Sequence, residues 1–506
     1  MAAITRCLAG VVALTALACG PALAQHPSSP AGSTSAAATP AKPADATPRL
    51  PADVATHHDL VLPGRTLHYT ATAGSITLSD ANGTAQAQIG FVAYTLDDAP
   101  PERRPVSFVM NGGPGSGSAW LQLGLLGPWR LPMNPEAAIP SAAPVPVDNA
   151  DTWLDFTDLV FIDPIGTGYS KMLVNNDENR KKYWSVNGDV ASLGEAIRHW
   201  LATGKRMTSP KFLIGESYSG LRVPRLAREL TKTQGVGISG MTLISPKLDY
   251  GGRSNANPTL EWLVELPSEV ATVRAKKGPV TRADMADVEA YAIGDYATDL
   301  LRGEDPAAVA RRVEHITALT GLDPALVQRR HGKIGAGEFL RELNRDKTEI
   351  GSIYDATVTK QDPFPQSAWS DVPDPMTDAL SAPVTSTIED IYARRLNWLP
   401  DAPYELGNDA VNRAWDFGNT YYKPESTSAL RQALAEDPNL HVLIGQGLFD
   451  LITPYFDQQL MLNQIPASVG RDRINFQVYP GGHMFYSRDA SRAAFREAAQ
   501  KLYAAP

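Results

Sequence analysis

Cysteine is almost absent from this chain of 506 residues, and the positions of the two cysteines exclude a disulfide framework. Cys7 and Cys19 both lie in the N-terminal segment 1–24, which has the pattern of a cleaved signal peptide. Arg6 supplies the positive charge, an apolar stretch follows it, and small residues precede the predicted cleavage point after Ala24. The mature protein would then have no cysteine, so no disulfide can form in it.

Export without disulfides, together with an alanine-rich signal, predicts a bacterial protein that is periplasmic or secreted. An alternative is lipid attachment at Cys19, but Ala16-Leu17-Ala18 is a poor lipobox because its leucine is displaced by one position. No other apolar run in the sequence is long enough to cross a bilayer, so we expect no membrane span.

Large apolar residues are nearly absent from 25–51, which is rich in Pro, Ala, Ser and Thr. Such a segment cannot bury enough surface to fold, and we expect a disordered linker there. The rest of the chain has ordinary composition, with 43% hydrophobic and 20% charged residues and a formal net charge of −9 over the whole sequence. This acidic balance argues against nucleic acid as a partner.

Short apolar runs that alternate with helix-like segments predict an α/β fold. Strand-like runs occur at 106–110, 159–162, 211–214, 241–245, 440–444 and 474–479. Alternation of this kind gives a mostly parallel sheet that is covered by helices on both faces. Earlier runs between Thr66 and Leu96 alternate in polarity around a turn signal at Asn82-Gly83, and they predict antiparallel strands at the start of the sheet.

A long stretch without strong strand signals, 249–426, precedes the last two predicted strands. Apolar residues with helical spacing and charged faces recur in it at 260–276, 282–302, 306–319 and 338–345. We interpret 249–426 as a helical cap inserted between two parts of an α/β core, 52–248 and 427–506. Because ligands of such a core bind beyond the carboxyl ends of its strands, the cap would form walls of the pocket.

One candidate nucleophile, Ser217, lies in Gly215-Glu216-Ser217-Tyr218-Ser219-Gly220. This string follows a predicted strand and precedes the helix-like segment 221–230. A turn from strand to helix at this place lifts a serine hydroxyl out of the sheet, as in the α/β-hydrolase fold. Ser219 stands where the usual motif has glycine, and a tight turn with a capping serine is the alternative interpretation.

Candidates for the other catalytic groups follow in the order that this fold uses, which is serine, acid and then histidine. Asp450 ends the glycine loop that follows the predicted strand 440–444, and His483 lies in the glycine loop that follows 474–479. We therefore predict a triad in which His483 is the base for Ser217 and Asp450 orients the histidine.

A candidate oxyanion site is formed by the glycine-rich string 111–118, directly after the predicted strand 106–110. In this fold one donor comes from such a loop and the other from the residue after the nucleophile. We therefore expect the main-chain N–H groups of Gly113 and Tyr218 to stabilise the oxyanion. No Lys-Ser/Thr pair follows the glycines, so a nucleotide-binding loop is not indicated.

Five blocks of the sequence resemble, in the same order, the signature blocks of the serine carboxypeptidase family of the carboxypeptidase Y and wheat carboxypeptidase type. The blocks are 111–118, 163–170, 215–220, 447–450 and 482–484. The resemblance implies an α/β-hydrolase that removes C-terminal residues from peptides, usually best at acidic pH. Together with the signal-like segment and the lack of disulfides, it predicts a bacterial exported member of the family. A peptide is the implied substrate, and we expect neither a cofactor nor a metal ion.

The same resemblance implies that Asn111 and Glu216 hold the terminal carboxylate of the substrate. We also expect Gly112 to bind the substrate and Met484 to line the leaving-group side. A protonated Glu216 can donate a hydrogen bond to that carboxylate, whereas an ionised one repels it. The alternative interpretation of Glu216 is a salt bridge to Arg222 or Arg225. Asp163 is expected to brace the glycine loop or a nearby main-chain amide.

The sequence also departs from the family pattern. The family usually places a second glutamate, paired with the one before the nucleophile, just before a Leu-Gly-Pro, and Leu125 stands at that position here. Without this partner Glu216 loses one influence that raises its pKa. Alternatives with the same fold are a proline iminopeptidase-like aminopeptidase and an esterase or acyltransferase, and an inactive binding module is the non-enzymatic alternative.

Overall fold

The computed structural model of the protein describes residues 48–134, 139–141, 144–251, 258–367, 374–418 and 423–504. The predicted signal peptide, both cysteines and nearly all of the predicted linker lie outside the described residues. The described part belongs to one compact unit, Ala46–Pro506, which is built around a sheet of ten strands.

The first three strands of this sheet are antiparallel. β1 (Val54–Leu62) pairs with β2 (Arg65–Ser79), which pairs with β3 (Ala85–Leu96). The runs predicted before the turn form the single strand β2, and β1 precedes them without having been predicted. Gly83 has a φ of +79° in the turn between β2 and β3, a conformation that glycine adopts without steric cost.

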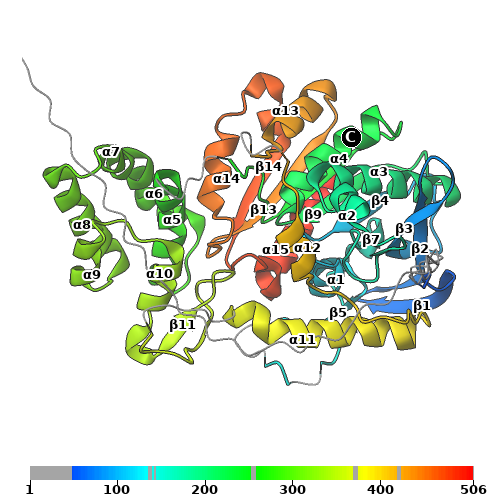
Figure 1. Ribbon diagram of the computed structural model, residues 1–506, viewed down its shortest axis with the longest axis horizontal. Coiled ribbons are helices and arrows are strands. Elements are labelled where there is room, and N and C mark those ends of the chain that lie inside the picture. The colour runs from blue at the N-terminus through cyan, green and yellow to red at the C-terminus, as the bar shows by residue number, and fades with distance from the viewer. Residues whose placement is uncertain are drawn as a thin grey trace, which may run out of the picture. The chain divides into compact units, whose positions relative to one another are not determined.

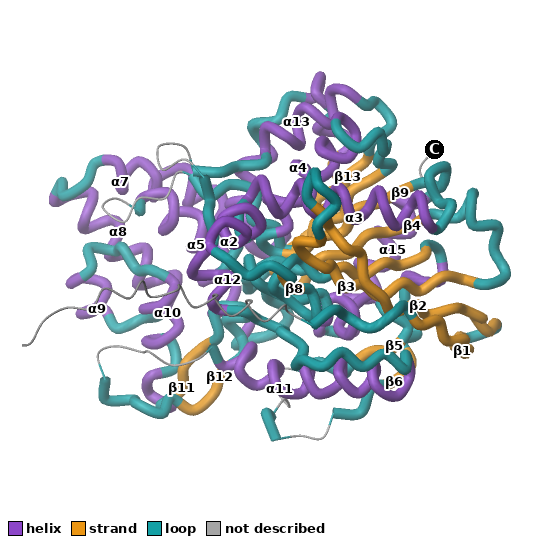
Figure 2. The backbone as a smooth tube through the Cα atoms, turned by 45° about the vertical axis from the view of Figure 1, so that its right-hand side comes forward, coloured by secondary structure: helices purple, strands orange, loops and turns teal. Residues whose placement is uncertain are grey.

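The other six long strands run parallel to one another, and β3 pairs with the first of them in antiparallel orientation. The strands are drawn in orange in Figure 2. Their order across the sheet is β7 (Asp158–Ile162), β4 (Val106–Met110), β9 (Lys211–Glu216), β10 (Gly240–Ile244), β13 (His441–Gly447) and β14 (Ile474–Tyr479). Every residue of β4, β7, β9 and β10 is buried, as expected for strands with both faces covered.

Alternate side chains along the buried strands belong to two apolar clusters, one on each face of the sheet. In β4, Phe108 belongs to a cluster with residues of α3 (Val186–Thr203) and α4 (Ser219–Lys232). Its neighbour Val109 belongs to a second cluster, which includes residues of α15 (Asp489–Tyr503). The period of two along a strand therefore divides the core into two layers.

Helices fill most of the chain between β10 and β13, and Figure 1 shows α5 to α10 grouped beside one another. They are α5 (Thr259–Ala275), α6 (Ala286–Tyr291), α7 (Ala297–Leu301), α8 (Pro306–Thr320), α9 (Pro324–Arg329), α10 (Ala336–Glu342), α11 (Pro375–Asp390), α12 (Asp409–Ala414) and α13 (Thr427–Glu436). The predicted helix 282–302 is interrupted at Gly294, which has non-helical φ and ψ of −99° and −105°. Leu448 and Tyr455, which follow β13, pack in the same apolar cluster as the first of these helices.

Short elements complete the fold. They are α1 (Ala119–Leu121), the π-helical turn η1 (Gln122–Leu126), β5 (Trp129–Arg130), β6 (Val147–Asp148), β8 (Lys171–Met172), α2 (Asp177–Tyr183), β11 (Glu349–Gly351), β12 (Thr359–Gln361), α14 (Tyr455–Leu462) and the 3-10 turn η9 (Phe485–Ser487). Among the described residues, no helix combines the length and the apolar character that crossing a membrane requires.

Candidate active site

Ser217 lies in a tight turn between β9, which ends at Glu216, and α4, which begins at Ser219. Its φ is +60°, which is rare for a residue with a side chain and is typical of functional sites. Two glycines allow the turn: an added Cβ at Gly215 would overlap Ser219, and one at Gly220 would lie 2.7 Å from a main-chain nitrogen. The local sequence therefore builds the strand-to-helix turn that the string 215–220 predicts.

His483 and Asp450 lie at the ends of β14 and β13, and both side chains are buried. The Nδ1 atom of His483 is 2.8 Å from Oδ2 of Asp450. Burial alone lowers the pKa of His483, but the charge of Asp450 and its hydrogen bond more than offset this and raise it above the usual value. This contact assigns the Nδ1 proton to the side of Asp450, so Nε2 is the ring nitrogen that can act as a base.

Asp450 is held by several donors besides His483. The main-chain N–H groups of Ile452 and Thr453 each lie 2.9 Å from its Oδ1 atom. The Oγ1 atom of Thr453 and the Nε2 atom of Gln446 lie 2.7 and 3.0 Å from Oδ2. Hydrogen bonds of this kind stabilise a carboxylate and fix its orientation.

One cavity of about 680 Å³ brings most of the predicted site residues together. Ser217 and His483 both line it, which places the predicted nucleophile and the predicted base on a shared surface. The other predicted site residues that line it are Asn111, Gly112, Gly113, Glu216 and Met484. Asp450 lies behind His483, away from the cavity lining.

The glycine loop 111–118 packs directly against the turn that carries Ser217. An added Cβ at Gly112 would lie 2.5 Å from the main-chain nitrogen of Tyr218, so only glycine permits this approach. Gly113 has a φ of +100° and lines the cavity. Tyr218 does not line the cavity: its side chain is buried against Trp415, and its main-chain nitrogen lies beside Gly112.

Asp163 supports the loop by accepting hydrogen bonds from Ser118, as the sequence predicts. Its Oδ1 atom accepts hydrogen bonds from the main-chain N–H and the hydroxyl of Ser118, both at 2.8 Å. The Tyr404 hydroxyl donates to the same oxygen at 3.0 Å. Asp163 is buried and does not line the cavity, so its contacts fit a supporting role.

Glu216 is buried at the edge of the cavity, with 3% of its surface exposed. The amide nitrogen of Asn111 donates to Oε2, and the Tyr486 hydroxyl lies 2.9 Å from Oε1. Burial raises the pKa of Glu216 to about 7, although the nearby His483 and these two hydrogen bonds oppose the rise. The carboxyl group is therefore largely protonated in mildly acidic solution.

The predicted alternative of a salt bridge from Glu216 is wrong. Arg222 pairs with Asp189, with a nitrogen–oxygen distance of 2.6 Å, and Arg225 donates to the main-chain oxygen of Glu425. Each guanidinium therefore has another acceptor, and neither forms an ion pair with Glu216.

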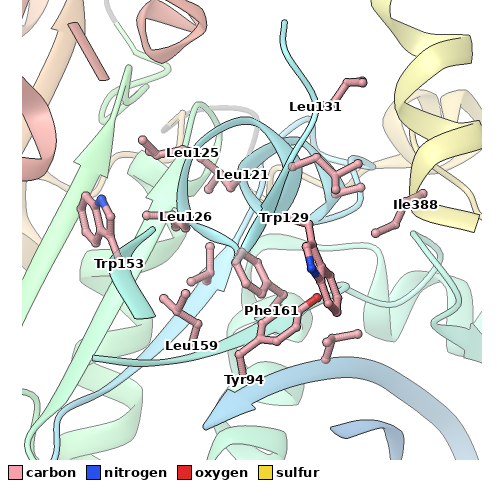
Figure 3. Close-up of a cluster of buried hydrophobic side chains, with 14 of the residues drawn as sticks. Tyr94, Leu121, Leu125, Leu126, Trp129, Leu131, Trp153, Leu159, Phe161 and Ile388 are labelled. Atoms are coloured by element: carbon pink, nitrogen blue, oxygen red, sulfur yellow. The ribbon is translucent and has the colours of Figure 1, made fainter. Parts of the chain in front are cut away.

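Leu125 is fully buried in an apolar cluster (Figure 3) and offers no polar group to Glu216. The group that contacts Oε1 of Glu216 is the hydroxyl of Tyr486, a residue that was not predicted. Its only signal is its place, three residues after His483 on a turn that follows the histidine loop.

Several residues that line the cavity were not predicted. Helix α11 contributes Thr377, Ser381 and Thr385, which lie one turn apart on one face. The other lining residues are Ser116, Trp120, Tyr354, Tyr404, Glu405, Leu406, Gly407, Asp409 and Ile452. The described residues include no group of three or more His, Cys, Asp or Glu side chains that could hold a metal ion.

Residues 66–278 match the family model described as serine carboxypeptidase. Serine carboxypeptidase-like 2 from Arabidopsis thaliana is 26% identical over 175 residues, which are 33% of this chain and 38% of that protein. Serine carboxypeptidase-like 13 from the same organism is 26% identical over 214 residues, which are 41% of this chain and 48% of that protein. The chain thus spans about half or less of the length of these curated relatives.

Among solved structures, the chain is similar to Kex1(delta)p, a prohormone-processing carboxypeptidase from Saccharomyces cerevisiae. The TM-score is 0.55 at 15% identity, and the match covers 86% of this chain and 91% of that chain. The predicted α/β-hydrolase fold is confirmed by this match, and the resemblance to the serine carboxypeptidase family is confirmed by the matches in sequence. Asp450 and His483 lie beyond the segment 66–278.

Proposed function

We propose that this protein is a serine carboxypeptidase, which hydrolyses the last peptide bond of a peptide through an acyl-enzyme. The observation that carries the proposal is the buried pair of Glu216 and Asn111 in the same cavity as Ser217 and His483. A neutral carboxyl group beside the nucleophile suits a substrate whose anionic end lies one residue beyond the scissile bond.

In this proposal Nε2 of His483 takes the proton of Ser217 as its hydroxyl oxygen attacks the scissile carbonyl carbon. The main-chain N–H groups of Gly113 and Tyr218 stabilise the oxyanion that forms. His483 then passes the proton to the leaving amine, the carbon–nitrogen bond breaks, and the released amino acid departs. Water, deprotonated by His483, hydrolyses the ester on Ser217, and Asp450 keeps the imidazole oriented throughout.

The terminal carboxylate of the substrate would be held by Glu216, Asn111 and the main-chain N–H of Gly112. Met484, which is buried and lines the cavity, would contact the leaving residue through a flexible thioether. We also propose 249–426 as a cap, since residues of α11 and of the loop before α12 line the cavity.

Three substrates test the proposal: an N-blocked dipeptide, an aminoacyl anilide and a simple ester. A serine carboxypeptidase releases the last amino acid from the blocked dipeptide. Hydrolysis of the anilide alone, with release of the arylamine, would instead support a proline iminopeptidase-like aminopeptidase. Activity on the ester alone would support an esterase or acyltransferase.

An organophosphonate that modifies activated serines tests whether the site is competent at all. We expect a single modification at Ser217 and none in the Ser217→Ala variant. Failure of Ser217 to react would support an inactive binding module.

Export is a further part of the proposal, with cleavage after Ala24 and a periplasmic or secreted mature protein. N-terminal sequencing of protein recovered from outside the cytoplasm of a bacterial host should begin at Gln25. A lipid-modified Cys19 at the N-terminus would contradict cleavage at that position.

A further inference from the structure

Glu216 contacts two neutral polar groups, one at each carboxyl oxygen. Asn111 donates from its amide nitrogen to Oε2, and the amide cannot be turned round because its oxygen already accepts from the main-chain N–H of Leu121 at 3.1 Å. The orientation of the Asn111 amide is therefore fixed from outside the site, and its NH₂ group always faces Glu216.

Packing also fixes the position of Tyr486, which contacts the other carboxyl oxygen of Glu216. Its ring is fully buried on η9, which packs against η1. An added Cβ at Gly124 would lie 2.7 Å from the Tyr486 ring, so the absence of a side chain there makes the space that the ring fills. The hydroxyl reaches Oε1 of Glu216 at 2.9 Å.

The positions of the hydrogen atoms follow from these contacts. Burial and the neighbouring Glu216 raise the pKa of Tyr486 well above 10, so its hydroxyl keeps its proton. If that hydroxyl accepted a hydrogen bond from Glu216, its own hydrogen would be left without a partner in a buried place, which is costly. The Tyr486 hydroxyl therefore donates, as the Asn111 amide does.

A neutral carboxyl group that accepts at both oxygens must direct its own acidic hydrogen elsewhere. The cavity shared with Ser217 is the polar space that Glu216 lines. We propose that Tyr486 is a positioning residue that, by donating to Oε1 of Glu216, directs the acidic hydrogen of Glu216 into the cavity, towards the substrate carboxylate. This inference rests on the proposed function for the identity of that acceptor.

Tyr486 also affects the pH at which Glu216 ionises. The charged groups whose fields act on Glu216 are His483, from the loop after β14, and Asp450, from the loop after β13, while Tyr354 is a neutral neighbour from the cap. Among the described residues, no second carboxyl group is hydrogen-bonded to Glu216, and Leu125 is apolar. A donated hydrogen bond stabilises the ionised form of Glu216, so Tyr486 also lowers the pH at which the site loses its acidic hydrogen.

The test uses the Ser217→Ala protein, in which no hydrolysis occurs, with and without Tyr486→Phe. Calorimetry measures the binding of an N-blocked dipeptide and of its C-terminal amide from pH 5 to 9. We expect Tyr486→Phe to weaken binding of the dipeptide acid several-fold at pH 5 and to leave binding of the amide unchanged. Binding of the acid weakens as the pH rises and Glu216 ionises, and the variant should raise the midpoint of this change by about one pH unit. Equal losses for acid and amide, or an unmoved midpoint, would overturn the inference.

An infrared titration of the Glu216 carboxyl, taken as the difference from Glu216→Gln, gives a readout that needs no substrate. Tyr486→Phe should move this midpoint upward as well, and an unmoved midpoint overturns the inference whatever the protein binds. If the parent binds acid and amide equally, the proposed function fails instead, so the two failures are distinguishable.

Tyr94→Phe is the matched control. Tyr94 lies in the same apolar cluster and its hydroxyl contacts Gln122, 2.8 Å away, rather than Glu216. Both variants keep the ring and lose one buried hydroxyl, so their thermal unfolding should be similar. Only Tyr486→Phe should change the pH dependence.

Discussion

Two buried carboxyl groups near His483, Asp450 after β13 and Glu216 at the end of β9, have different surroundings. Both have 3% or less of their surface exposed. Five donors, two of them main-chain N–H groups, contact Asp450, whereas Glu216 has two neutral partners. Equally buried carboxyl groups can therefore have different surroundings in one site: five donors fix the orientation of Asp450, whereas burial raises the pKa of Glu216 to about 7.

Asp450→Asn should have the largest effect, because it replaces an acceptor for the Nδ1 proton of His483 with a group that can donate. The histidine then favours the wrong tautomer, and we expect kcat to fall by about 10⁴-fold. Steady-state rates on the blocked dipeptide and on an ester should fall alike, since both need the base. A loss confined to the dipeptide would contradict the assignment of Asp450.

Glu216→Gln should affect only substrates with a free carboxylate. Because the pKa of Glu216 is about 7, only about one thirtieth of the parent is protonated at pH 8.5. Glutamine keeps N–H donors at every pH, so the variant should be slower than the parent at pH 5 and at least as fast at pH 8.5. Values of kcat/KM for both proteins between pH 5 and pH 8.5 test whether their pH profiles cross. Parallel profiles would contradict the prediction.

The pH profile of the unaltered protein should also differ between substrates with and without a free carboxylate. Above about pH 7, ionisation of Glu216 should lower kcat/KM for the blocked dipeptide by about tenfold per pH unit. An ester without a carboxylate should show no such fall. On the acidic side both substrates should lose activity together, because His483, with its raised pKa, must be neutral to act as a base.

Thr453→Val should have the smallest effect, since it removes one of the five donors to Asp450 and keeps the shape of the side chain. The Thr453 hydroxyl is 2.7 Å from Oδ2 of Asp450 and 3.2 Å from Nδ1 of His483. We expect kcat to fall about three- to tenfold, equivalent to roughly 1 kcal/mol for one hydrogen bond. A loss as large as that of Asp450→Asn would show that Thr453 does more than support the acid.

Prediction succeeded where the pattern is local. The parallel strands were found within a few residues of their observed ends, because continuous apolar runs between turn residues suit buried strands. Helix α11 was missed: it is rich in Ser and Thr and has Pro383 in its interior, features that lower intrinsic helix propensity. The break at Gly294 was missed because a glycine within a helical pattern does not by itself show that the helix stops.

The sequence alone determined the turn around Ser217, because that turn depends on steric limits among adjacent residues. The close approach of Gly112 to Tyr218 joins two distant segments, so the tertiary structure decided it. The tertiary structure decided which groups meet Glu216. Tyr486 lies 270 positions away, and the arginines that the sequence offered were already held by Asp189 and the main chain. Local geometry follows from the backbone preferences of a few neighbouring residues, whereas the partner of a buried carboxyl group depends on which distant side chains packing brings within about 3 Å.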